Sequence, residues 1–164
     1  MGSAARPVPG SSRRALPPAA RWVRVSSLVL SLLGLAVSAY LTIEHYSAGN
    51  TLACPATATI NCAKVTTSAY STLFGIPVAV LGLAFFVAMS LMCVPQAWRS
   101  GSAVATRGRL AAVGIGVLFV VYLVWAELFR IDAICLWCTF VHVVTLALFA
   151  VIALGAALRP ADDG

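Results

Sequence analysis

Long apolar stretches separated by short polar segments dominate this chain. The four stretches run from about Val23 to Ile43, from Leu73 to Val94, from Leu110 to Phe129 and from Ala133 to Leu158. A helix rises ~1.5 Å per residue, so about 20 apolar residues cross a hydrocarbon core roughly 30 Å thick. The pattern therefore predicts four transmembrane helices with a large loop between the first and the second, which together form a four-helix bundle.

Composition supports this prediction by excluding other classes of protein. Hydrophobic residues make up 61% of the 164 positions and charged residues 10%, whereas an ordinary soluble domain has about 25% charged residues. A soluble domain of this size has too little interior to hide so much apolar surface. The net charge of +6 does not indicate nucleic-acid binding, because the basic residues lie between the apolar stretches. We expect an all-α integral membrane protein that binds no nucleic acid.

The basic residues predict the orientation of the helices. Only Lys64 and Arg130 lie in the 44–72 loop and in the short 129–133 connection. The other basic residues lie before or at the start of the first stretch, between the second and the third, or after the fourth: Arg6, Arg13, Arg14, Arg21, Arg24, Arg99, Arg107, Arg109 and Arg159. Positively charged loops stay in the cytoplasm. We therefore expect a multi-pass protein of the cell membrane with both termini cytoplasmic and both of these connections outside.

The chain divides into one membrane domain and two tails. Residues 1–20 are rich in Pro, Ala, Ser and Arg, which is typical of a disordered cytoplasmic tail. The membrane domain is expected over residues 21–159, and residues 160–164 form a second cytoplasmic tail. The first apolar stretch is longer than the ~7–15 residues of a signal-peptide core, so we expect it to remain as a membrane helix.

The positions of the 5 cysteines indicate redox chemistry. Cys54 and Cys62 lie in the large outer loop, and Cys135 and Cys138 form a Cys-x-x-Cys motif at the outer end of the fourth stretch. All of these lie on the side of the membrane where disulfides persist. Cys93 lies near the cytoplasmic end of the second stretch, where we expect it to be a small buried apolar residue.

The two cysteine pairs differ in what a disulfide could do. A bridge between Cys54 and Cys62 would contribute ~2.5 kcal/mol of chain-entropy stabilisation, so that pair alone favours a structural staple. The Cys-x-x-Cys ring is shorter and strained, and such a bridge is easily exchanged. If the fourth helix begins near Ala133, Cys135 lies in its first turn. There the free N–H groups and the helix dipole stabilise a thiolate.

His142 follows Cys138 by four residues and Cys135 by seven, so these three side chains lie along one helix face. An imidazole at membrane depth usually faces the bundle interior and marks a site. The alternative is a histidine that only bonds a neighbouring helix. The cysteines and His142 could also hold zinc. We expect no metal, because one pair lies at a helix end on the bilayer boundary and the other in an oxidising compartment.

The order of these residues resembles the bacterial homologues of vitamin K epoxide reductase. That family combines two loop cysteines, a serine, a Phe-Gly pair and a Cys-x-x-Cys that opens the last helix. The matching segments are Cys54, NCAKV at 61–65, SAY at 68–70, FGIP at 74–77 and CLWC at 135–138. The resemblance covers about residues 22–158 and implies a four-helix bundle that encloses a quinone.

The resemblance also implies a role for each cysteine of the two pairs. Cys54 and Cys62 carry electrons from an external thiol to Cys135, and Cys138 passes them to the quinone. The electron donor is expected to be a separate thioredoxin-like (DsbA-like) protein outside the cytoplasm, because the chain stops at Gly164 without a fused domain of that kind. Either menaquinone or ubiquinone fits as the acceptor.

Four further residues are expected near the quinone on the same grounds. His142 falls where the vertebrate enzymes have a tyrosine that hydrogen-bonds a quinone oxygen, and imidazole can make the same bond. Ser68 matches the serine of the family near the contact between loop and bundle. Phe74 and Trp137 are expected either as walls of the pocket or as packing residues of the core.

The expected function is therefore a membrane thiol–disulfide oxidoreductase that supports disulfide bond formation. One alternative is the reverse relay, in which thiols reduce a quinone epoxide. The other is a non-enzymatic tetraspan scaffold with a structural loop disulfide. A scaffold explains Cys54 and Cys62 but gives no reason for Cys135, Cys138 and His142 on one helix face.

Overall fold

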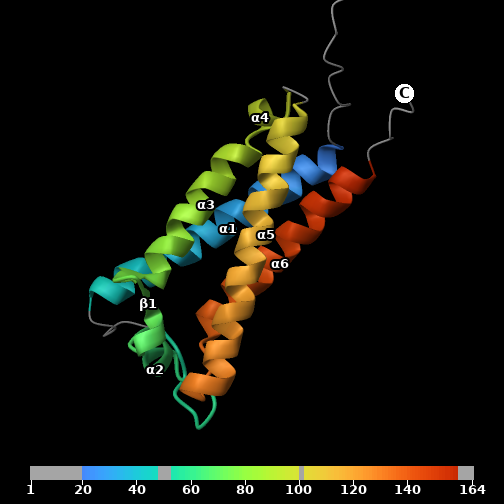
Figure 1. Ribbon diagram of the computed structural model, residues 1–164. Helices are drawn as coiled ribbons and strands as arrows, with labels where there is room; N and C mark the ends of the chain where they lie inside the picture. The colour runs from blue at the N-terminus through green and yellow to red at the C-terminus, as the bar shows by residue number, and fades with distance from the viewer. Residues whose placement is uncertain (1–19, 48–52, 100–101, 159–164) are drawn as a thin grey trace, which may run out of the picture.

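The computed structural model describes residues 20–47, 53–99 and 102–158, and these ranges are mostly helical (Figure 1). The expected tails at residues 1–20 and 160–164 lie outside the described residues, apart from Ala20. In chain order the elements are α1 (Arg21–Tyr46), α2 (Cys62–Thr66), the 3₁₀ turn η1 (Ala69–Ser71), β1 (Thr72–Leu73), β2 (Ile76–Pro77), α3 (Val78–Cys93), α4 (Pro95–Arg99), α5 (Ala103–Ala126), the π-helical turn η2 (Glu127–Ile131) and α6 (Leu136–Ala157).

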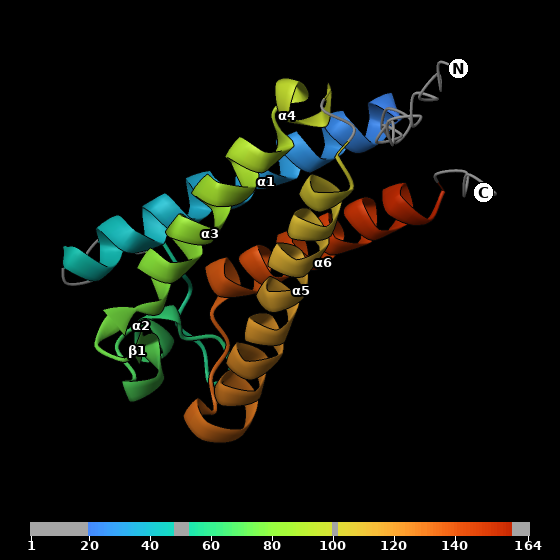
Figure 2. The ribbon, with the colours of Figure 1, turned by 45° about the horizontal axis from the view of Figure 1, so that its top comes forward.

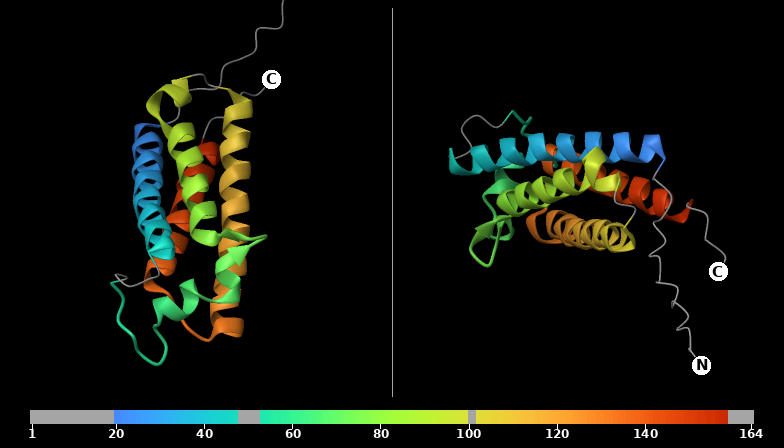
Figure 3. Two further views of the ribbon diagram at one scale, coloured as in Figure 1. Left: turned by 90° about the vertical axis from the view of Figure 1, so that its left-hand side faces the viewer. Right: turned by 90° about the horizontal axis from the view of Figure 1, so that it is seen from above.

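Four apolar helices run alongside one another, as the sequence pattern predicts (Figure 3, left). Three of them are long and apolar enough to cross a membrane, namely Arg21–Tyr46, Ala103–Ile131 and Leu136–Ala157. The fourth, α3, has 16 residues and is the shorter apolar helix among the described ranges. The chain is thus an all-helical bundle, and the prediction of this fold class is confirmed.

Proline explains why α3 is shorter than its apolar stretch. The stretch was expected to be helical from Leu73, but the helix begins at Val78, directly after Pro77. At its other end Val94 precedes Pro95 and adopts an extended conformation, with φ −58° and ψ 147°. A proline ring excludes the helical region for the residue before it. Pro95 then opens α4, where the missing N–H costs nothing.

Small residues allow α1 to pack closely against α3 and α6. Ser27, Ser31 and Gly34 lie on one face of α1 and are buried. The hydroxyl of Ser31 donates to the carbonyl of Ser27 at 2.7 Å, so its polar atom is satisfied within the helix. The ring of Phe86 from α3 lies directly over Gly34, where a Cβ atom would collide with it. Helix contacts of this kind are typical of membrane bundles.

The two ends of the bundle are built differently (Figure 2). At the end where α4 lies, Arg109 of α5 is buried over the ring of Trp98 at 3.8 Å. Its guanidinium donates to the carbonyl of Met92 in α3 at 2.7 Å and to that of Ala97 in α4 at 2.8 Å, which ties the ends of these helices to α5. Arg109 was expected as a loop charge, whereas the structure places it inside a helix contact. The opposite end holds α2, the β1–β2 hairpin and η2.

Candidate redox site

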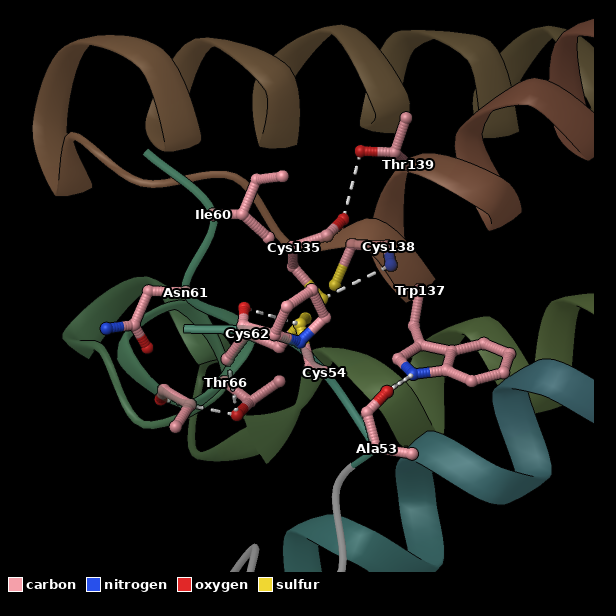
Figure 4. Close-up of a disulfide and its surroundings, with 12 residues drawn as sticks. Ala53, Cys54, Ile60, Asn61, Cys62, Thr66, Cys135, Trp137, Cys138 and Thr139 are labelled. Atoms are coloured by element: carbon pink, nitrogen blue, oxygen red, sulfur yellow. Dashed lines mark hydrogen bonds between the residues drawn. A yellow bond between two sulfur atoms is a disulfide. The ribbon is translucent and has the colours of Figure 1, made fainter. Parts of the chain in front are cut away.

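The cysteines of the two pairs meet at the end of the bundle that carries α2 (Figure 4). Cys54 and Cys62 form a disulfide with 6.1 Å between their Cα atoms. Cys135 and Cys138 are free thiols. Cys62 and Cys135 belong to one buried cluster, and the partly buried Cys54 and Cys138 pack against it. Residues more than 70 positions apart in sequence thus form one group.

A short parallel pairing docks the loop onto the segment before α6. The backbone N–H of Ile134 donates to the carbonyl of Thr59 at 2.9 Å, and that of Asn61 donates to the carbonyl of Ile134 at 3.1 Å. Asn61 also caps α2, since its side-chain oxygen accepts from the N–H of Lys64 at 2.9 Å. These bonds set Cys62, the first residue of α2, beside Cys135.

Cys135 is the N-cap of α6 rather than a residue of its first turn. Its sulfur accepts a hydrogen bond from the backbone N–H of Cys138 at 3.3 Å. The side chain of Cys138 also donates to this sulfur, and that bond lowers the pKa of the Cys135 thiol against the opposing effect of burial. The expectation of a stabilised thiolate at a helix N-terminus agrees with this arrangement.

Trp137, between the two cysteines of the motif, lies against the loop. Its indole N–H donates to the carbonyl of Ala53 at 3.0 Å (Figure 4). The N–H of Ala53 in turn donates to the hydroxyl of Tyr40 at 3.1 Å, and the rings of Tyr40 and Trp137 lie 5.1 Å apart. These bonds fix the residue that precedes Cys54. Trp137 is not among the residues that line the cavity described next.

A cavity of about 360 Å³ opens between the helices directly behind the Cys-x-x-Cys motif. Cys138 and His142 lie in its wall, and His142 is buried. Glu127, at the start of η2, also lines it. The remaining wall is mostly apolar and includes Leu81, Phe85, Phe86, Phe119, Leu123 and Val141. The cavity therefore combines an apolar interior with a thiol, an imidazole and a carboxyl group at one end.

Ser68 and Phe74, the two other residues expected near the quinone, lie in different places relative to the cavity. Ser68 lines the cavity, and its hydroxyl donates to the carbonyl of Val65 at 2.8 Å. Phe74 is 97% exposed and lies outside the cavity. It shares the tight turn of the β1–β2 hairpin with Gly75, and both residues have a positive φ, 51° and 81°. Hairpins with two-residue loops need this backbone conformation.

Two groups at the site were absent from the sequence-based expectations. Glu127 lies near the end of the third apolar stretch, and the structure buries it beside Cys135. Arg130 donates from its Nε to the hydroxyl of Tyr70 at 2.6 Å, which ties η2 to η1. An acidic residue near the end of an apolar stretch was the available signal for Glu127.

The remaining cysteine lies at the other end of the bundle. Cys93 is fully buried among the apolar residues around Phe86 and Met89, as expected. Within residues 20–47, 53–99 and 102–158, no group of three or more His, Cys, Asp or Glu side chains could hold a metal ion.

Comparison with protein-family models gives one finding. Residues 25–153 match the vitamin K epoxide reductase family. No curated protein matches the chain. The matched range includes most of α1 and α6, all of α3 and α5, both cysteine pairs and the cavity wall.

Proposed function

The chain belongs to the vitamin K epoxide reductase family, and we propose that it carries electrons from an extracytoplasmic thioredoxin-like protein to a quinone in the membrane. Members of this family are four-helix membrane bundles that act as quinone-reducing thiol oxidoreductases. One observation gives this electron path its main support. Cys138 contacts Cys135 and also lines the cavity, so a single sulfur joins the thiol chemistry to the space for a quinone.

The exposure of the two loop cysteines supports an order in which they react. Cys62 is 1% exposed, whereas Cys54 is partly exposed. A thiolate of the partner protein attacks Cys54, because Cys54 is the more exposed residue of the loop disulfide. This attack frees Cys62 as a thiolate beside Cys135. Thiol–disulfide exchange requires such access for the attacking sulfur.

The second exchange moves the electrons inward. Cys62 attacks Cys135 of a Cys135–Cys138 disulfide, which forms a Cys62–Cys135 bond and frees Cys138. A second thiol of the partner resolves its bond to Cys54, and Cys54 then displaces Cys135 from Cys62. The products are a Cys54–Cys62 disulfide and a Cys135–Cys138 dithiol, which is the thiol state found in the structure. The partner leaves with its own disulfide formed.

The cavity suits a quinone ring. Its wall is apolar and aromatic, and His142 supplies a nitrogen that can bond a quinone oxygen. A bound quinone supplies the acceptor for two electrons. Cys138 lies at the cavity wall, so the pair is oxidised from this side, while burial of Cys135 keeps water away from its sulfur. Ser68 holds the loop end of the wall through its bond to Val65. Menaquinone and ubiquinone both offer this ring chemistry.

Single substitutions test the relay. In Cys138→Ser the thiolate of Cys135 can attack Cys62 of the Cys54–Cys62 disulfide, so a Cys62–Cys135 disulfide should form with Cys54 released as a thiol. Cys135→Ser lacks the attacking sulfur and should not form it. Both should abolish quinone reduction. Cys93→Ser is the matched control, because that cysteine is buried at the other end, and it should retain full activity. Mass spectrometry of non-reduced peptides identifies the trapped pair. Quinone reduction by either motif variant would overturn the relay, and a Cys54–Cys135 product would reverse the order of the loop cysteines.

The orientation of the bundle is part of the proposal. The asymmetry of the basic residues supports cytoplasmic termini and extracytoplasmic cysteines in the cell membrane. Ala63 and Gln96 are exposed at opposite ends of the bundle. A membrane-impermeant maleimide added to intact cells should therefore label Ala63→Cys and spare Gln96→Cys. The opposite labelling would place the cysteine pairs in the cytoplasm.

A further inference from the structure

Glu127 is a buried carboxyl group for which the relay described above has no use. Its side chain is 6% exposed, and Ala126 and Ile131 around it are buried apolar residues. An ionisable side chain at membrane depth is costly and usually serves a site. Glu127 lines the same cavity as Cys138 and His142.

The backbone around η2 places this carboxyl next to the thiol pair. The π-helical turn Glu127–Ile131 is followed by Asp132 in the left-handed conformation, with φ 51° and ψ 50°. The chain therefore turns back, and the N–H of Ala133 donates to the carbonyl of Glu127 at 3.2 Å. The N–H of Cys135 donates to the carboxylate of Glu127. A π-helical turn inserted in a helix is frequent at functional sites.

Among the described residues, the other titratable groups around the cavity are not carboxyl groups, or they do not line it. From η1 the hydroxyl of Tyr70 accepts from Arg130, and from α2 the ammonium of Lys64 donates to the carbonyl of Asp132 at 3.2 Å. From α1, His45 lines the cavity, and from α6, Cys138 and His142 do so. No other Asp or Glu of the described residues lines it.

The chemistry of the proposed function requires proton transfer at this place. Oxidation of the Cys135–Cys138 dithiol to its disulfide releases two electrons and two protons. Reduction of a quinone to the quinol takes up the same number of each. A water-poor cavity needs a side chain that accepts protons from sulfur and donates them to oxygen.

We propose that Glu127 carries the protons of the Cys135–Cys138 dithiol to the quinone in the cavity. This inference rests on the proposed function. As the sulfur–sulfur bond forms, the carboxylate accepts one thiol proton and donates it to a quinone oxygen. It is then a carboxylate again and transfers the second proton in the same way. Two protons leave sulfur, two reach oxygen, and the electrons pass from the dithiol to the quinone.

The substitution Glu127→Gln tests proton transfer while it keeps the local structure. The amide keeps an oxygen that can accept from the N–H of Cys135 but cannot carry a proton between two groups. We expect quinol formation from the pre-reduced protein to slow ~10²-fold or more in single turnover. Glu127→Asp keeps the acid and should recover part of this loss. Glu44→Gln is the matched control, since Glu44 is also buried but does not line the cavity, and it should leave the rate unchanged.

A second readout needs no quinone. Infrared difference spectra between the dithiol and disulfide forms of the quinone-free protein should contain a carboxyl band that disappears in Glu127→Gln. The Cys62–Cys135 product should still form in Glu127→Gln combined with Cys138→Ser, which shows that the variant folds and exchanges thiols. An unchanged rate together with an unchanged infrared spectrum would overturn the role of Glu127. Failure of the unaltered protein to oxidise its Cys135–Cys138 dithiol with quinone would instead overturn the proposed function.

Discussion

Trp137→Phe tests whether the residue inside the Cys-x-x-Cys motif positions the loop. The substitution removes the indole N–H that donates to the carbonyl of Ala53 at 3.0 Å and keeps an aromatic ring near Tyr40. A hydrogen bond of this kind contributes ~0.5–1.5 kcal/mol, which corresponds to a change of about two- to twelvefold in an equilibrium constant. We therefore expect the docked state of the loop to lose stability by that factor.

Backbone amide exchange measures this effect directly. In Trp137→Phe the N–H groups of Asn61 and Ile134, which form the docking bonds, should exchange about two- to twelvefold faster. Formation of the Cys62–Cys135 product should slow by a similar factor. Tyr40→Phe is the matched variant, because it removes the hydroxyl that accepts from the N–H of Ala53 at 3.1 Å.

The same variant distinguishes the two interpretations of Trp137. If Trp137 positions the loop, Trp137→Phe leaves the reaction between the pre-reduced motif and quinone unchanged. If Trp137 instead forms part of the wall of the quinone pocket, Trp137→Phe alters that reaction and leaves amide exchange in the loop unchanged. The second result would refute the reasoning from the hydrogen bond to Ala53.

Two further predictions follow from contacts at the site. The bond from Cys138 lowers the pKa of the Cys135 thiol, so its thiolate persists to lower pH than that of an ordinary cysteine and is lost as the pH falls through this lowered value. Cys138→Ala should raise the pH at which iodoacetamide reacts with Cys135, and Cys138→Ser, which keeps a donor, should raise it less; equal profiles would contradict the assigned cause. In α5, a Cβ on Gly116 would lie 2.8 Å from the ring of Phe85, whereas one on Gly114 meets nothing within 4 Å. Gly116→Ala should cost ~1–3 kcal/mol by thermal unfolding in detergent, and Gly114→Ala should be neutral or stabilise by ~0.5–1 kcal/mol.

The position of the redox pairs followed from local patterns in the sequence. Apolar length gave four helices, and the alternation of connections put both pairs at one end of the bundle, where the structure places them. The family resemblance gave the ordered set of cysteines, and the match over residues 25–153 confirms the family. These features depend on the sequence near each residue, so a pattern can reveal them.

The helix boundaries were harder to predict, since hydrophobicity does not distinguish a helix from a short hairpin. Residues 72–77 are apolar enough to extend a span, yet Pro77 and the turn at Phe74 and Gly75 make them a hairpin. Phe74 was expected in the pocket or the core and is 97% exposed instead, because its place at the tip of that turn carries its ring away from the bundle.

By itself the sequence determined that this chain crosses a membrane and which family it resembles, and that resemblance implied that the two cysteine pairs meet. The tertiary structure alone decided which side chains face the cavity and which face the loop. Trp137 and Cys138 are neighbours in one helix, but their directions differ by about 100° around its axis, so one bonds Ala53 and the other lines the cavity. Glu127 acquires its position beside Cys135 only because a π-helical turn and a left-handed residue fold the chain back. Such turns depend on the packing of distant segments, and no local pattern specifies them.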